Sequence, residues 1–185
     1  MPAALISKEQ VVERLFEVFR DRGFEGASLS DLSRATGLGK SSLYHYFPGG
    51  KDQMAEVVLA RAADIVDQGI LAVARNGDSL KARLGAIASA LRTFYSNGTT
   101  ACVLGQLSGA GLSKTARASL RTSFDNWIQA IEVLAIDAGF TPARAHRFAQ
   151  DWVGRLQGAL ILHAATADTA PFDRALKALL DLAKT

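Results

Sequence analysis

The sequence predicts an all-α protein, in which a short helical N-terminal domain over residues 1–50 is joined by a connecting helix to a larger helical domain over residues 51–185. Apolar residues recur at steps of three and four along nearly the whole chain, which is the period of one helix face. Ser, Asn, Gly and Pro stand between these runs, where helices begin and end. Hydrophobic residues make up 49% of the 185 residues, enough to bury a sizeable core.

The first predicted helix opens with a capping box. The run Ser7-Lys8-Glu9-Gln10 places a hydroxyl and an amide side chain three residues apart, so that each can satisfy a backbone N–H of the first turn. Gly23 is expected to end this helix. Its predicted apolar face consists of Val12, Leu15, Phe16 and Phe19.

Residues 28–51 predict two short helices around a tight turn, with the sequence S-L-S-D-L-S-R-A-T-G-L-G-K-S-S-L-Y-H-Y-F-P-G-G-K. Ser28 and Ser30 can cap the first of these helices. Thr36-Gly37-Leu38 then breaks it, because glycine adopts the positive φ that such a turn requires. This is the pattern of a helix-turn-helix.

The second short helix is predicted to present a polar face. Leu43 and Phe47 are expected to point into the core and to leave the residues between them facing outward. No acid occurs between Asp31 and Asp52, so the cations of this stretch form a surface suited to phosphates. A helical hairpin with a polar exposed face is the alternative. The residues predicted to contact DNA are Ser28, Ser30, Arg34, Gly39, Lys40, Ser41, Ser42, Tyr44, His45, Tyr46 and Lys51.

This segment, with the helix before it, resembles the DNA-binding domain of tetracycline-repressor (TetR) family regulators, whose motif reads roughly Leu-Tyr-x-His-Phe-x-x-Lys. The chain departs from it by exchanging His45 and Tyr46 and by adding one residue within Phe47–Lys51. With the added residue, this segment resembles that of the LmrA/YxaF-like subgroup of the family. The resemblance implies a repressor that leaves its DNA operator when a small molecule binds. It also implies that the last two helices pair across a two-fold axis.

The larger domain is predicted to be helical throughout. The connecting helix spans residues 52–69, and Ser79 caps the helix that follows. The Gly/Ser-rich piece over residues 102–113 predicts a short, loosely packed helix. A long helix over residues 114–138 ends at Gly139, the next begins at Thr141-Pro142 and continues to about Ala167, and the last begins at Phe172.

The Gly/Ser-rich piece could border a ligand cavity, because the domain has too much apolar material to be only a spacer. Plain core packing is the alternative for each candidate. For Cys102, a redox bond across a dimer is a further option. The candidates for lining the cavity are Phe94, Tyr95, Cys102, Gln106, Trp127 and Trp152.

Small residues interleave with apolar ones on the last two helices and allow close helix packing. An intrachain core is the alternative interpretation. One helix-turn-helix unit contacts too few phosphates and bases for tight specific binding, which favours a homodimer. The candidates for the dimer interface are Gly154, Gly158, Ala159, Ile161, Leu176 and Leu179.

Other function classes are not favoured. Gly39-Lys40-Ser41 imitates the end of a phosphate-binding loop, but Arg34 stands where that loop needs glycine. The three histidines lie far apart, so no metal site is predicted, and neither a cofactor nor a catalytic group is expected. The chain is not expected to be an enzyme, because no catalytic constellation is found. One cysteine, no signal peptide and no run long enough to span a membrane predict a cytoplasmic protein.

The predicted function is therefore a ligand-responsive transcriptional regulator, a repressor whose partners are a double-stranded DNA operator, a small-molecule inducer and a second copy of the chain. The net charge of +3 permits nucleic-acid binding without requiring it. Two alternative functions would share some of these predicted features. A helical protein-interaction adaptor would use the same helix faces, and a small-ligand carrier or lyase would keep the cavity, both without specific DNA binding.

Overall fold

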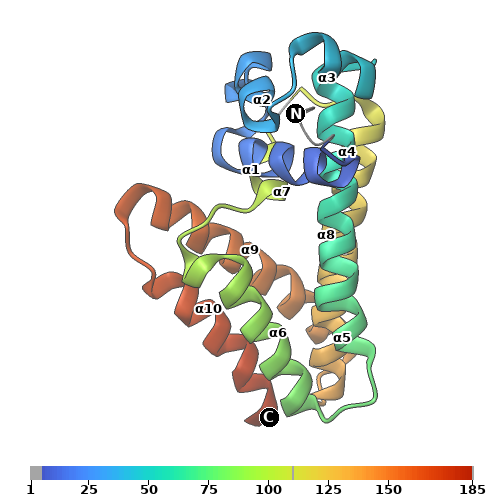
Figure 1. Cartoon of the computed structure of the whole chain (residues 1–185). Coiled ribbons are helices and arrows are strands. Elements are labelled where there is room, and N and C mark those ends of the chain that lie inside the picture. The colour runs from blue at the N-terminus through green and yellow to red at the C-terminus, as the bar shows by residue number, and fades with distance from the viewer. Residues whose placement is uncertain (1–5, 110, 185) are drawn as a thin grey trace. The chain divides into compact units, whose positions relative to one another are not determined.

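The computed structural model describes residues 6–109 and 111–184, and the ordered elements in those ranges are all helical (Figure 1). The chain divides into two compact units. Unit 1 contains the chain up to Ala63 together with Val103–Arg121, and unit 2 contains Asp64–Cys102 together with residues 122–185. The division lies further along the chain than the predicted boundary at residue 50, because the first turns of the connecting helix pack into the core of unit 1.

Unit 1 is built from three N-terminal helices, the first part of the connecting helix and a returning segment. The capping box predicted at Ser7 is present, with Gln10 N donating to Ser7 Oγ at 3.2 Å. Gly23 has a φ of 65° and kinks the first helix, which then continues to Gly26 instead of ending there. The elements of unit 1 are α1 (Lys8–Gly26), α2 (Leu29–Thr36), α3 (Lys40–Tyr46), α4 (Gly50–Val66, up to Ala63), α7 (Val103–Leu107) and the first part of α8 (Lys114–Asp137).

The returning segment closes the core of unit 1. Helix α7 packs on α1, and its apolar residues Val103, Leu104 and Leu107 are buried. The expectation of a loosely packed helix was therefore wrong for this stretch, because these three side chains fill the space beside the α1 kink. At the start of α8, Ser113 Oγ donates to Glu56 Oε1 of α4 at 2.7 Å. Fully buried side chains of the unit 1 core are Leu15, Phe19, Leu32, Leu43, Phe47 and Met54.

Unit 2 is a helical bundle in which α10 packs against both α9 and α6 (Figure 1). The indole Nε1 of Trp152 donates to Ala175 O at 2.8 Å and ties α9 to α10. The connecting helix continues into this unit through a π-helical segment, Asp67–Leu71. The other elements of unit 2 are α5 (Ala72–Arg75), α6 (Leu80–Phe94), a 3-10 turn (Ser96–Gly98), the rest of α8, α9 (Pro142–Thr166), α10 (Ala170–Leu180) and a C-terminal 3-10 turn (Asp181–Lys184).

Two further contacts fix unit 2 internally. Arg83 of α6 is 8% exposed, and its guanidinium donates to Ala74 O at 2.5 Å and to the Asp137 carboxylate at 2.7 Å. Gly98 lies so close to α10 that a Cβ at this position would be 2.6 Å from Cγ of Phe172. The turn between α6 and the following segment therefore admits only glycine at residue 98.

Candidate nucleic-acid interface

The turn between α2 and α3 is held by side-chain hydrogen bonds. Gly37 has a φ of 72°, as its place in the sequence predicted. The Ser33 hydroxyl donates to Leu38 O at 2.6 Å, and the Thr36 hydroxyl donates to Leu32 O at 2.8 Å. The first bond ties α2 to the loop that follows it, and the second fixes the Thr36 side chain against the last turn of α2. The direction in which α3 leaves the turn is thereby fixed.

Helix α3 turns its apolar residues inward and its polar residues outward. Leu43 and Phe47 are fully buried, as expected from their spacing. Tyr44 is 45% exposed, and its ring rests against the following turn, because a Cβ at Gly50 would lie 3.5 Å from Tyr44 Cε1. The residues exposed on this face are Lys40, Ser41, Ser42, Tyr44 and His45, whereas Tyr46 is half-buried.

Three predicted contact residues lie at helix starts. Ser28 Oγ accepts from Asp31 N at 3.1 Å and donates to the Asp31 carboxylate at 2.6 Å, so this hydroxyl serves α2 as a cap. Ser30 is exposed in the first turn of α2. Gly39 is exposed at the start of α3 and has open space around it.

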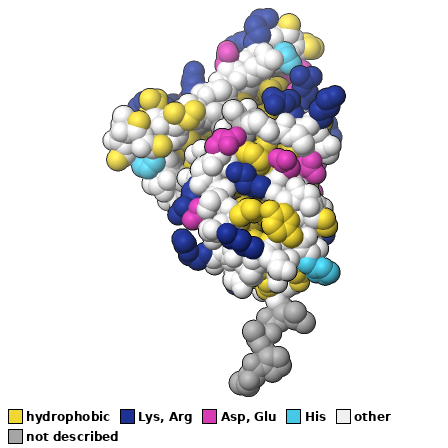
Figure 2. All heavy atoms as spheres, turned by 90° about the horizontal axis from the view of Figure 1, so that it is seen from above, with side chains coloured by type: hydrophobic (Ala, Val, Ile, Leu, Met, Phe, Trp, Pro, Cys, Tyr) yellow, Lys and Arg dark blue, Asp and Glu magenta, His cyan; other side chains and the backbone are white. Residues whose placement is uncertain are grey.

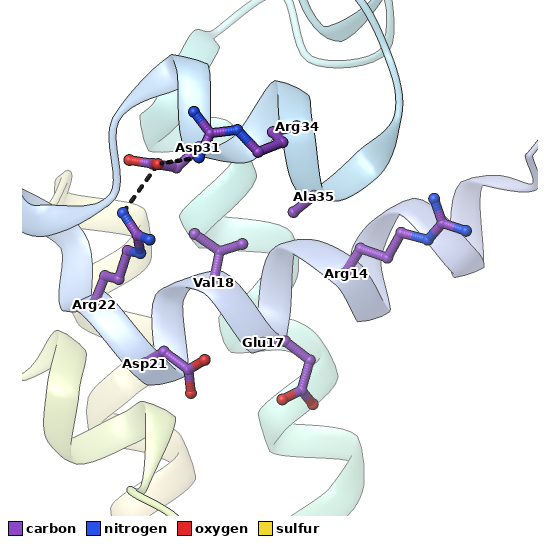
Figure 3. Close-up of a pocket in the computed structure, with 8 residues that line it drawn as sticks. All are labelled: Arg14, Glu17, Val18, Asp21, Arg22, Asp31, Arg34 and Ala35. Carbon is purple, nitrogen blue, oxygen red and sulfur yellow. Dashed lines mark hydrogen bonds and ion pairs between the residues drawn. The ribbon is translucent and has the colours of Figure 1, made fainter.

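The sequence predicted that no nearby acid offsets the charge of Arg34. In the structure, Asp31 does so. The Arg34 guanidinium lies 3.5 Å from the Asp31 carboxylate, and Arg22 reaches the same carboxylate at 2.9 Å (Figure 3). The missed signal was Asp31 itself, one helical turn before Arg34. The hydrogen bond from Ser28 lowers the pKa of Asp31, and the two arginines lower it further, so the carboxylate stays charged.

This ion-pair cluster borders an open groove of about 380 Å³ between α1 and α2 (Figure 3). Its walls carry three arginines and three acids, which leaves its net charge balanced. Arg14, which the sequence analysis missed, donates from the groove to Thr36 O at 2.9 Å and caps the end of α2. No local pattern could have revealed it, because its partner lies 22 residues away. The lining residues are Arg14, Glu17, Val18, Asp21, Arg22, Asp31, Arg34 and Ala35.

Lys51 was predicted to contact a DNA phosphate beside the exposed polar face of α3, called the reading face below. The structure directs its side chain into unit 1 instead. Its Nζ donates to Phe24 O at 2.8 Å and to Ala27 O at 3.3 Å. It also lies 4.4 Å from the centroid of the Phe24 ring. The prediction considered only the neighbours of Lys51 in sequence, and the end of α1 lies beside it in space. Of the three cations predicted to meet phosphates, Lys40 alone makes no hydrogen bond or ion pair within the described residues.

Figure 2 shows lysine and arginine side chains at several places on one face of the molecule, with acidic side chains among them. On the face shown, the cationic side chains are therefore interspersed with acidic ones. A phosphate contact on such a surface depends on individual side chains more than on the total charge.

The predicted ligand residues are not all in one unit. Gln106 belongs to unit 1, where α7 meets α1, and a Cβ at Gly23 would lie 3.4 Å from its carbonyl oxygen. The others belong to unit 2. The Trp152 indole N–H donates a hydrogen bond to Ala175 O. The buried Nε1 of Trp127, in contrast, has no hydrogen-bond partner in the described part of the chain. Phe94 is half-buried, and Tyr95, Cys102, Trp127 and Trp152 are buried.

Half of the predicted dimer residues are corrected by the structure. Ala159, Leu176 and Leu179 are at most 2% exposed and belong to the core between α9 and α10. Their apolar spacing marked a buried face without showing whether the partner is the same chain or a second one. Gly154 and Ile161 are exposed and Gly158 is half-buried.

Large apolar side chains are exposed near the end of α9 and at the last residue of α10. Ile161 is 69% exposed, Leu162 is 50% exposed and Leu180 is 38% exposed. The sequence analysis missed Leu162 and Leu180. Ile161 and Leu162 are adjacent, so they point in directions about 100° apart around α9. This local pattern does not by itself show that both are exposed.

Neither a metal-binding cluster nor a membrane-spanning helix occurs in the described ranges. No group of three or more histidine, cysteine or acidic side chains in those ranges is arranged so that it could hold a metal ion. The helices described are not long and apolar enough to cross a bilayer.

The described geometry, with a helix-turn-helix in unit 1 and a separate helical unit 2, defines a class of bacterial DNA-binding regulators. The chain belongs to this class: residues 11–58 match the family of bacterial regulatory proteins called the tetR family. Within that family, residues 78–178 match the C-terminal domain of LmrA/YxaF-like transcriptional regulators. The subgroup suggested by the added residue before Lys51 is thereby confirmed.

Individual relatives agree with this assignment. The uncharacterized HTH-type transcriptional regulator Rv0196 of Mycobacterium tuberculosis is 26% identical over 184 residues, covering 95% of this chain and 93% of that protein. The HTH-type regulator LmrA of Bacillus subtilis is 37% identical over 49 residues, which is 26% of each chain.

A solved structure of similar fold is a TetR transcriptional regulator from Legionella pneumophila. It has a TM-score of 0.83 at 16% identity and covers 97% of both chains. A TetR-family regulator from Agrobacterium tumefaciens has a TM-score of 0.80 at 19% identity, covering 94% of this chain and 95% of the other. These similarities confirm the all-α fold.

Proposed function

We propose that the protein is a ligand-responsive repressor, which binds a two-fold symmetric DNA operator as a homodimer and is released from it by a small molecule. The observation that carries the proposal is the face of α3, where Lys40, Ser41, Ser42, Tyr44 and His45 are exposed while the residues between them anchor the helix. This face offers hydrogen-bond donors, one uncommitted cation and no carboxylate. It suits the major groove, into which a recognition helix of this kind fits.

The residues of α3 have different roles in this proposal. Lys40, Ser41 and Ser42 stand in the first turn of α3, where the N-terminal residues of a recognition helix meet the DNA. Ser41 and Ser42 contact base edges, and the ammonium of Lys40 contacts a phosphate. Tyr44 and His45 stand one turn further along and contact the sugar-phosphate backbone or a thymine methyl group. Phosphate contacts supply most of the affinity, and base contacts select the sequence.

The exposed apolar residues at the end of α9 and on α10 support a homodimer. Ile161 and Leu162 are largely exposed in the monomer. Covering them with a second copy of the chain would lower the free energy, because apolar surface is removed from water. A two-fold axis would then present two copies of α3 to two operator half-sites. Unit 1 of a single subunit would not bind an operator tightly.

The buried aromatic residues of unit 2 support a small-molecule response. The Trp127 ring stacks on Phe124 with centroids 6.4 Å apart, and its buried N–H has no acceptor within the described residues. A buried donor without a partner is unfavourable, and a ligand oxygen would satisfy it. A ligand that binds the DNA-free state more tightly shifts the population toward that state.

Titration with DNA tests the proposal. Regulators of this kind often control their own genes, so the probe is a labelled fragment from upstream of the protein's own gene, with a shuffled fragment of equal length as the control. Measurement of fluorescence anisotropy at fixed salt should show affinity for the upstream fragment at least about a thousandfold higher than for the shuffled one. Equal affinities for the two fragments, with and without unlabelled competitor, would contradict operator binding at this locus.

Light scattering tests the assembly. Ile161→Arg places a charge on the proposed interface, and Ile136→Arg places the same charge on α8, at a residue that is 43% exposed. The first variant should be monomeric and should lose specific DNA binding, while the second should remain dimeric. A dimeric Ile161→Arg protein that still binds the operator would place the interface elsewhere.

A further inference from the structure

We infer that Lys51 is a positioning residue that fixes the aim of α3, and that it is not a ligand of the DNA phosphates. This inference rests on the proposed DNA binding. The ammonium of Lys51 joins three elements of unit 1, because it starts from the first turn of α4, donates to Phe24 O in α1 and donates to Ala27 O just before α2. Its distances to the two oxygens are 2.8 and 3.3 Å.

The end of α1 is a favourable place for this cation. The last carbonyl groups of a helix have no partner within it and carry partial negative charge. The Phe24 ring adds its π face, 4.4 Å from Nζ. Phe24 is itself held in place, since its ring stacks on the buried Phe19 ring with centroids 6.2 Å apart.

The position of Lys51 in α4 gives a second reason for this contact. A cation in the first turn of a helix is disfavoured by the helix dipole, whose positive end lies there. The side chain of Lys51 carries its charge away from that end and brings it to the carbonyl groups of the last turn of α1, after the Gly23 kink. The two helix termini are thus linked through one side chain that satisfies the electrostatics of both.

The link reaches the reading face through the residue before Lys51. Gly50 has a φ of 66°, and its N–H donates to Phe47 O at 2.8 Å, which closes the turn after α3. A Cβ at Gly50 would lie 3.5 Å from Cε1 of Tyr44. Helix α3 has only seven residues, so its orientation depends on the turns at its two ends. Lys51 anchors the second of these turns.

Lys51 has little capacity left for DNA. An ammonium group has three N–H donors, and here two of them are directed at backbone carbonyls. Lys40, in contrast, is exposed and uncommitted within the described residues. The two lysines therefore form a matched pair, in which each is changed and the same quantities are measured.

The experiment measures the salt dependence of binding to the upstream fragment and to the shuffled fragment with the full-length protein. Lys51→Met keeps the apolar stem and removes the ammonium. It should weaken specific binding by about ten- to a hundredfold, the worth of one misaligned base contact, and leave binding to shuffled DNA and the salt slope unchanged. Lys51→Arg should restore specific binding, because a guanidinium can donate to both carbonyls and stack on Phe24.

Lys40→Met is the control. It should weaken binding to both fragments and lower the salt slope by about 0.9 per subunit, the loss expected for one phosphate contact. A slope lowered by that amount in Lys51→Met would show that Lys51 is a phosphate ligand and would overturn the inference. Lower thermal stability in Lys51→Met with unchanged affinity for both fragments would overturn it too, since the role would then be structural only.

Hydrogen exchange separates this inference from the proposed function. In the DNA-free protein, Lys51→Met should increase amide exchange in α3 and leave exchange in α9 and α10 unchanged, and Lys51→Arg should reverse the increase. If the wild-type protein does not distinguish the two fragments, the proposed operator is wrong and this exchange result still decides the role of Lys51. Unchanged exchange in α3 would overturn the positioning role.

Discussion

Replacement of Gly98 by alanine should destabilise unit 2 for two separable reasons. A Cβ at this position would lie 2.6 Å from Cγ and 2.7 Å from Cβ of Phe172. The Phe172 ring cannot move aside easily, because it is fully buried and packs edge to face on Tyr95. Gly98 also has a φ of 90°, a conformation that alanine rarely adopts.

The magnitude follows from these two terms. The positive φ costs an alanine about 1–2 kcal/mol, and forcing a methyl group into a filled space costs about 1–3 kcal/mol. Gly98→Ala should therefore lower the free energy of unfolding by about 2–5 kcal/mol. Urea unfolding followed by far-UV circular dichroism measures this quantity.

Gly139 supplies the matched control. It has the same φ of 90°, at the end of α8, and no atom lies within 4 Å of a Cβ built there. Gly139→Ala should therefore show the conformational term alone, about 1–2 kcal/mol. Equal destabilisation by the two substitutions would refute the close contact between Gly98 and Phe172.

Further predictions concern both units. Ser28→Ala should lower stability by about 1 kcal/mol in urea unfolding, because it removes the cap of α2. Since folding lowers the pKa of Asp31, its contribution is present at neutral pH and is lost as the pH falls below about 4; in Ser28→Ala this acid-dependent loss should be smaller. Tyr44→Ala should abolish operator binding in anisotropy while the thermal unfolding temperature stays close to that of the wild type; a large fall would show that the ring is structural. In light scattering and circular dichroism, Ala159→Arg should unfold the protein, whereas Gly158→Arg should give a folded monomer.

Local features of the fold could be predicted from the sequence. The caps at Ser7 and Ser28 and the turn at Gly37 depend on residues within four positions of one another, and a local pattern contains all that determines them. The buried Leu43 and Phe47 were predictable for the same reason, since the helix period alone sets which side they face.

The partners of distant residues could not be predicted in this way. Lys51 meets carbonyls 24 and 27 residues away, and Arg14 meets one 22 residues away. These contacts exist only once the helices have packed. The same limit applies to Ala159 and Leu179, because an apolar residue on a helix can be buried equally well by its own chain or by a copy of it.

Both tryptophans of the chain, Trp127 and Trp152, lie in unit 2, and unit 1 contains none. Their environments differ, since the Trp152 indole donates to a backbone carbonyl and the Trp127 indole has no partner within the described residues. Light absorbed at the red edge of the indole band is therefore emitted by unit 2 alone. A change in that emission on adding DNA would show that an event at α3 is sensed in the other unit, without any label attached to the protein.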